Sequence, residues 1–346
     1  MVFASSMMHR RVRNTFLVLG LLLAATTVVT PLIGSAGVPL GDVFWQLRVP
    51  RLALAMLAGG VLATAGAVFQ GTFRNPLATP FTLGVSSGAA LFVAVGVTLG
   101  GKALDSSIAQ TALALSGAAL TVCVVFGIAR LRPGAAVTTL LLAGISISFI
   151  CSAGIALVLA LAGEHAIAMI VRWTMGSVEI VGAGAWRVMA PATVVAVVAG
   201  GVIARVHRDL DLIMMGELVA AGRGVNVRRA RASAYFAASA MTGAVVALCG
   251  PIAFVGLVVP HVMRAVLGPL HARLLPACVL GGMIFLPVCD TIAHHMLPWL
   301  TNAGVLAAVG LPANSAQLPV GVLTNLLGGL FFLYLLLTYR EERPLV

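Results

Sequence analysis

Charged side chains are scarce in this sequence. Among 346 residues there are 21 Lys and Arg and 10 Asp and Glu, so that 9% of the chain is charged and 60% is hydrophobic. An average soluble domain carries about 25% charged residues, and the mean hydropathy of +1.09 lies far above that of a solvated domain. The composition therefore excludes an ordinary soluble enzyme, a disordered chain and a fibrous repeat.

The sequence also has few residues for metal or redox chemistry. All of its five cysteines lie inside apolar runs, without CxxC or Cys/His metal-ligand spacing: Cys123, Cys151, Cys249, Cys278 and Cys289. We interpret them as small core residues. No cofactor and no metal is expected in this chain.

Motifs for nucleotide or ion chemistry are incomplete. One near miss to a Walker A sequence, Gly96 to Ala103, has Ala103 where Ser or Thr would hold magnesium, and no strand precedes it. Asp209 and Asp211 form half of an acidic magnesium motif, and we interpret them as solvating a loop. Asp290 is the only acidic residue in an apolar run, and one carboxylate seldom makes a proton pathway.

Long apolar segments dominate the sequence from about residue 15 to residue 338. In a bilayer each segment must be helical, because helices satisfy their own backbone hydrogen bonds, and each crossing needs about 20 residues. We therefore predict an all-α polytopic membrane protein, with residues 1–346 forming a single transmembrane domain. Charge, Pro and Gly clusters divide it into ten spans, near residues 15–34, 52–71, 81–100, 108–129, 136–162, 186–204, 230–248, 252–267, 274–293 and 318–338. The first apolar run is longer than a signal-peptide core, and we expect a retained span.

The basic residues indicate the orientation of these spans. With a cytoplasmic N-terminus, sixteen Lys and Arg lie inside, and five lie outside: Arg48, Arg51, Lys102, Arg172 and Arg187. This asymmetry agrees with the positive-inside rule. It predicts that both termini are cytoplasmic and accounts for the net charge of +11 without any nucleic-acid partner.

Three connections are longer than a tight turn. The outer connection 163–185 is predicted to hold a short interfacial helix, and the cytoplasmic connection 207–229 a short helix on the membrane surface. The outer connection 298–317 is rich in Gly, Pro and Asn and is predicted to be a loop.

Four strings of residues carry a more specific signal. The first runs from Arg48-Val-Pro50-Arg51 through Gly59-Gly60, Gly66 and Gln70 to Arg74-Asn75-Pro76-Leu77-Ala78. The second contains Gly216-Glu217, Ala220 and Gly224-Val225-Asn226, the third runs from Gly250-Pro251 to Pro260-His261, and the fourth is Leu318-Pro319-Val320-Gly321. In this order the strings resemble signatures of the FecCD family, which are permeases of ABC importers for iron-siderophores, haem and cobalamin.

The resemblance implies a type II ABC importer permease in the inner membrane that pairs with a second copy or a close relative. It implies that the chain is not an enzyme, because separate cytoplasmic ATP-binding subunits hold ATP and magnesium. The expected cargo is an iron-siderophore or a related metal chelate. Besides its protein partners, the chain is expected to contact membrane lipid.

The resemblance also implies roles for individual residues. Arg48 and Arg51 are expected to dock acidic residues of a periplasmic or lipid-anchored binding protein, and His294 stands where the family has a further docking arginine. The ATPase is expected to contact Gly216, Glu217, Ala220, Gly224, Val225 and Asn226 within the coupling segment 207–229. Two helix breaks, Arg74-Asn75-Pro76 and Gly250-Pro251, are expected to line or gate the translocation path on opposite sides of the membrane, as in inverted repeats.

The sequence departs from the family pattern at four positions and leaves alternatives open. Besides His294, these are Gln317 for Glu, Arg223 for Leu and Leu330 for Pro, and the outer loop near 298–316 looks inserted. Haem or cobalamin as cargo fits the same architecture. An ion-gradient-driven secondary transporter would require ionisable groups in mid-membrane, and a membrane-embedded enzyme would require distant Glu, His and Asp residues to meet.

Overall fold

The fold is entirely helical over the residues that the computed structural model describes, which are 2–33, 41–42, 44–104, 106–131, 137–179, 182, 184–308 and 317–338. The α-helices there are α1 (Val2–Leu32), α2 (Val49–Phe73), α3 (Val85–Gly100), α4 (Ser107–Arg130), α5 (Val137–Leu161), α6 (Glu164–Thr174), α7 (Ala185–Met215), α8 (Glu217–Gly222), α9 (Val227–Cys249), α10 (Val255–Leu267), α11 (His271–Asn302), α12 (Val305–Ala308) and α13 (Val320–Thr338). A π-helical turn η1 (Phe44–Arg48) precedes α2, and two short 3-10 turns, η2 (Phe81–Leu83) and η3 (Gly101–Leu104), flank α3. The all-α prediction is confirmed.

Eight of the described helices are long and apolar enough to cross a membrane, namely α1, α2 with η1, α4, α5, α7, α9, α11 and α13. Two further apolar helices, α3 with 16 residues and α10 with 13, lie at the third and eighth predicted positions. At 1.5 Å per residue they measure about 24 and 20 Å, less than the roughly 30 Å hydrocarbon core. Both follow an irregular segment, 74–84 before α3 and 250–254 before α10.

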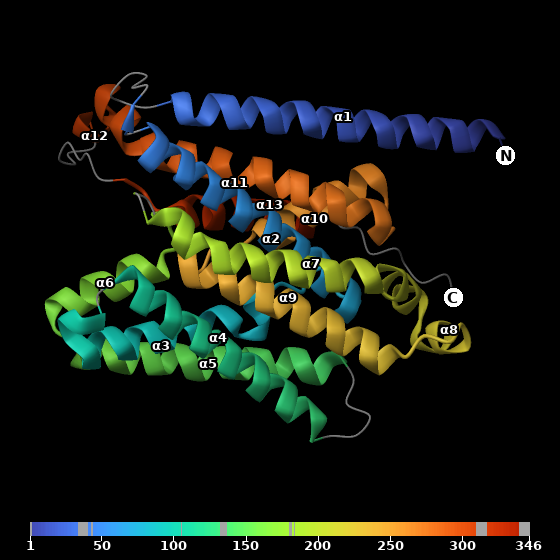
Figure 1. Ribbon diagram of the computed structural model, residues 1–346, viewed down its shortest axis with the longest axis horizontal. Coiled ribbons are helices and arrows are strands. Elements are labelled where there is room, and N and C mark those ends of the chain that lie inside the picture. Colours follow the sequence, from blue (N-terminus) through green and yellow to red (C-terminus); the bar gives the residue numbers. More distant parts are fainter. Residues whose placement is uncertain are drawn as a thin grey trace.

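The bundle has two distinct ends in Figure 1, with α6 and α12 at one end and α8 at the other. We call these the α6 end and the α8 end. Helix α1 begins at the α8 end and runs alongside α11 (Figure 1). Helix α13 starts beside Gly176, just after α6, where the amide of Gly321 donates to the Gly176 carbonyl, so it runs back toward the α8 end. Helix α1 therefore begins at the end of the bundle toward which α13 points back.

Helix α2 forms the centre of the bundle, packed against α7, α9, α10 and α11. Its buried face is rich in Ala and Gly, which allow backbones to approach closely where lipid provides no hydrophobic force between helices. A methyl group on Gly59 would overlap the carbonyl of Gly282 on α11, and one on Gly66 would overlap the carbonyl of Gly256 on α10. The glycine pattern of α2 is therefore required by helix crossings.

The structure corrects two predicted boundaries. Helix α7 continues to Met215 instead of ending near 204, so residues 207–215 are helical and not part of a loop. Helix α11 continues to Asn302 and is followed by α12, so the predicted outer loop begins later than residue 298; residues 309–316 lie outside the described part of the chain. Both extensions begin with charged or polar residues, which end an apolar run in a hydropathy profile but do not end a helix. The short helices predicted at 163–185 and 207–229 are present as α6 and α8.

Candidate functional site

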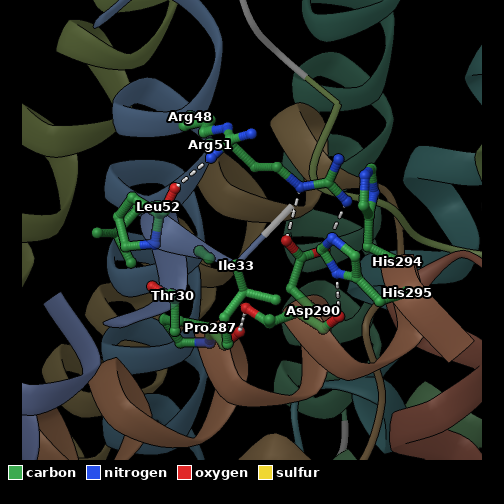
Figure 2. A pocket seen from close by; sticks show the side chains of 12 residues that line it. Thr30, Ile33, Arg48, Arg51, Leu52, Pro287, Asp290, His294 and His295 are labelled. Atoms are coloured by element: carbon green, nitrogen blue, oxygen red, sulfur yellow. Dashed lines mark hydrogen bonds and ion pairs between the residues drawn. The ribbon is translucent and has the colours of Figure 1, made fainter. Parts of the chain in front are cut away.

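A small pocket opens at the α6 end, between α1, α2 and α11 (Figure 2). Its volume is about 140 Å³. Three of its polar residues are those predicted to dock a binding protein, Arg48, Arg51 and His294, and Asp290 and His295 join them from α11. Pro50 in the first turn of α2 favours a helix start there, which places both arginines at the mouth of the pocket.

Arg51 and Asp290 form a bidentate ion pair inside this pocket (Figure 2). The Arg51 Nε donates to Asp290 Oδ2 at 2.7 Å and Nη2 donates to Oδ1 at 2.9 Å. The side chains are 23% and 8% exposed. Such parallel hydrogen bonds between charged groups are the stronger kind of ion pair. The Arg51 guanidinium therefore lies on Asp290 and joins α2 to α11.

The sequence contains one signal for this pair. A carboxylate within a membrane span needs a charged or polar partner, and Asp290 is the only acidic residue in an apolar run. The partner lies 239 residues away in the chain, and sequence distance alone does not identify it.

Arg48 and His294 complete the polar lining of the pocket. Arg48 Nη1 donates to the carbonyl of Pro31 on α1 at 2.8 Å. The rings of His294 and His295 meet edge to face with centroids 4.9 Å apart, and His295 Nδ1 lies 2.9 Å from the Thr291 carbonyl. His294 Nδ1 is buried and has no hydrogen-bond partner among the described residues. The fold brings the three predicted docking residues together, while their docking role stays a prediction.

The predicted coupling residues gather at the opposite end of the bundle, around α8 (Figure 1). Gly216 (φ 140°) and Gly224 (φ 82°) have backbone conformations that favour glycine, and they allow the chain to turn on both sides of α8. Asn226 caps α9, because its side-chain oxygen accepts from the Arg229 amide at 3.0 Å. Glu217 pairs with Arg231 on α9 at 2.7 Å.

The two faces of α8 differ in exposure. Ala220 is fully buried and packs in a small apolar cluster with Ile213 of α7 and Ala230 of α9. Leu218 is 90% exposed. Helix α8 is therefore part of a packed turn between α7 and α9 that presents an apolar side chain, Leu218, to its surroundings.

The two predicted path motifs lie at opposite ends of the bundle. Arg74 ends α2 in the left-handed conformation (φ 50°), and Asn75 Oδ1 accepts from the Leu77 amide at 2.9 Å, which forms a turn. Gly250 (φ 66°) ends α9 against the carbonyl of Trp173, and the Ser177 amide donates to the Cys249 carbonyl at 2.7 Å. Pro76 and Pro251 follow these ends directly. The opposite placement agrees with the predicted inverted arrangement, and the motifs form two separate sites.

Asp211 has a different role from the predicted one. It lies within α7 and accepts from both the backbone amide and the ring of His271, with His271 Nδ1 at 2.6 Å. His271 is fully buried at the first turn of α11. Asp211 therefore caps α11 and ties it to the helix that leads into α8, instead of solvating a loop.

Comparison with known proteins identifies the relatives of this chain. A model of the FecCD transport family matches residues 14–338. The hemin transport system permease protein HmuU of Yersinia pestis is 34% identical over 87% of this chain and 86% of that protein. The cobalamin import system permease protein BtuC of Halobacterium salinarum is 35% identical over 86% and 74%, and the Fe(3+) dicitrate transport system permease protein FecD of Escherichia coli is 35% identical over 86% of each.

The fold has a solved counterpart as well. A metal-chelate type ABC transporter in an inward-facing conformation superposes with a TM-score of 0.81 at 26% identity, covering 94% of this chain and 99% of that one. The chain thus has the architecture of a multi-pass ABC transporter permease, which is not itself an enzyme. It belongs to the FecCD transport family.

Proposed function

We propose that this chain is the translocation subunit of an ATP-driven importer that carries a metal chelate across the inner membrane, with both termini in the cytoplasm. The observation that carries the proposal is the placement of the two polar regions: the pocket with Arg48, Arg51 and His294 lies at the α6 end, and the coupling segment lies at the α8 end. A binding protein delivering cargo on one side and an ATPase acting on the other require this separation.

In this proposal the chain supplies the path and the mechanical element, and the ATPase supplies the bond chemistry. Two ATP-binding subunits contact α8 of two permease copies, identical or closely related, and nucleotide binding shifts α7 and α9 through the packed turn. A periplasmic or lipid-anchored binding protein docks its acidic residues near Arg48 and His294. The permease changes between outward-facing and inward-facing forms because its partners bind these two forms with different affinities.

The first candidate cargo is a ferric siderophore, with haem and cobalamin as the alternatives. The names of the similar permeases include hemin, cobalamin and ferric citrate, which supports a chelated metal as the cargo class. A binding protein that selects the cargo leaves the path with little need for specific affinity, and within the described part of the chain no polar side chain favours one chelate.

The ion-gradient alternative receives less support. A secondary transporter requires titratable groups exposed along the path in mid-membrane, whereas Asp290 lies near the α6 end and is neutralised by Arg51.

Reconstitution tests the proposal. The permease is placed in liposomes with its ATPase, and uptake of ferric siderophore, haem and cobalamin is recorded with and without binding protein and ATP. We expect uptake of one chelate that requires both partners. Uptake driven by an ion gradient in the absence of the ATPase would overturn the proposal.

A further inference from the structure

An apolar groove runs along one side of the bundle and reaches His207, where the coupling segment begins. Its wider part has a volume of about 760 Å³ and its narrower part about 340 Å³. The two parts share Thr64 of α2, Gly200 of α7 and Val279 of α11, so they form one continuous groove. Helices α7 and α11 form its walls, and α2 forms its floor.

The groove matches the depth of a bilayer. It follows α7 from Trp186 to His207, and 21 residues at 1.5 Å each span about 32 Å, close to the roughly 30 Å hydrocarbon core. Val194 and Val197 on its rim are 61% and 69% exposed, so the groove opens sideways. An apolar hollow of this kind does not hold water. In a bilayer it faces the acyl chains of the surrounding lipids.

The two ends of the groove differ from its middle. Trp186 stands at the α6 end, where an indole is favoured at the membrane interface. At the α8 end the lining includes His207, and Arg208 follows it on the exposed surface. A basic side chain at this depth complements the phosphate of a lipid headgroup.

We propose that this groove binds a membrane phospholipid, with an acyl chain lying between α7 and α11 and its phosphate next to Arg208. A flexible chain has room in the hollow, because a methyl group on Gly200 would meet no atom within 4 Å. Small residues such as Ala196 also line it, as they do at helix contacts in membranes. The interfacial Trp186 at one end and the exposed Arg208 beyond the other favour a lipid, because they match its interfacial region and its phosphate. The proposal does not depend on the identity of the cargo.

The open space at Gly200 provides a direct test. In Gly200→Leu the new side chain enters the junction of the two parts of the groove, at a position where an added Cβ meets no atom within 4 Å. Gly127→Leu is the matched control, because Gly127 on α4 is equally open and does not line the groove. Ala204→Phe fills the narrower part and serves as a second groove-filling variant.

The full-length protein is equilibrated in vesicles of equal amounts of phosphatidylglycerol and phosphatidylcholine, extracted in mild detergent, and its bound phospholipid is counted by native mass spectrometry. We expect phospholipid retained by the wild type and by Gly127→Leu, and about tenfold less, or ~1.4 kcal/mol, in the groove-filling variants. Arg208→Gln is expected to remove the preference for phosphatidylglycerol.

Two outcomes would overturn the proposal. One is equal phospholipid retention in the wild type and in folded groove-filling variants. The other is a wild type that retains no phospholipid but loses a second protein copy when Gly200 is replaced, which would assign the groove to a protein interface.

Discussion

At the scale of single residues, the polar groups of this chain are arranged in pairs that join distant helices. Arg51 on α2 holds Asp290 on α11, and Asp211 on α7 holds His271 on α11. In each pair one member is almost fully buried, and a buried ionised group is costly unless a partner compensates it. These pairs therefore specify how α11 sits against α2 and α7.

The Arg51–Asp290 pair is expected to respond unequally to removal of its two members. Arg51→Ala leaves a buried carboxylate without a partner and should cost about 2–3 kcal/mol of stability, whereas in Asp290→Ala the long Arg51 side chain can extend to water and the cost should be about 1 kcal/mol. The measurement is the apparent melting temperature in detergent. The double variant should resemble Asp290→Ala, and an equal loss in both single variants would contradict this account.

At the scale of helices, close backbone crossings determine the packing. Gly59 of α2 meets Gly282 of α11 without space for a side chain. Exposed glycines such as Gly127 on α4 have no such neighbour. The 38 glycines of the chain thus include some that a close helix crossing requires and others that are exposed and have no such neighbour. Composition alone does not distinguish the two kinds.

Alanine substitutions distinguish these two kinds of glycine. Gly59→Ala should destabilise the protein by about 1–3 kcal/mol because α2 and α11 must separate. Gly127→Ala should be neutral or stabilising by up to about 1 kcal/mol, because alanine loses less conformational entropy in a helix. Thermal unfolding of the two variants, measured side by side, checks the difference, and a stable Gly59→Ala would mean that the crossing is looser than described.

The coupling segment has its own prediction at this scale. Leu218→Glu places a charge on the exposed apolar face of α8 and should weaken association with the ATPase about tenfold or more, without changing the melting temperature. Titration of the ATPase onto the permease in detergent measures the affinity. Leu131→Glu, at an exposed leucine that ends α4, is the control and should bind normally; equal weakening in both variants would indicate a general charge effect.

At the scale of the whole molecule, the two ends of the bundle differ in what they carry. The coupling segment and the first turn of α1 lie at the α8 end, and the pocket with Arg48 lies at the α6 end. The asymmetry of basic residues predicts that the α8 end is cytoplasmic.

Cysteine labelling in vesicles tests this orientation. With the exposed native Cys123 replaced by Ala, the remaining native cysteines are buried. A cysteine at Leu218 should react with a membrane-impermeant maleimide only from the cytoplasmic side, and one at Leu99, which is exposed near the end of α3, only from outside. Labelling of Leu218→Cys from outside would reverse the assigned topology.

The sequence by itself determined the fold class, the positions of ten apolar helices, the short helices α6 and α8, and the family. Each depends on information that is local in the chain, such as a hydrophobic run, a break at Asn75-Pro76 or Gly250-Pro251, or a string of motif residues. The gathering of Arg48, Arg51 and His294 at one end also followed, because the order of crossings determines the end at which each loop lies.

Only the tertiary structure decided which side chains meet. The partners of Asp290 and Asp211 and the apolar groove beneath Gly200 depend on which helices pack together and at what separation, and residues far apart in sequence contribute to each. The extension of α7 to Met215 was not predicted because charged residues at 208, 209 and 211 interrupt the apolar run, although Leu210 and Ile213 continue the buried face of the helix. Hydrophobicity therefore predicts how the chain crosses the membrane, and packing determines what the crossings bring together.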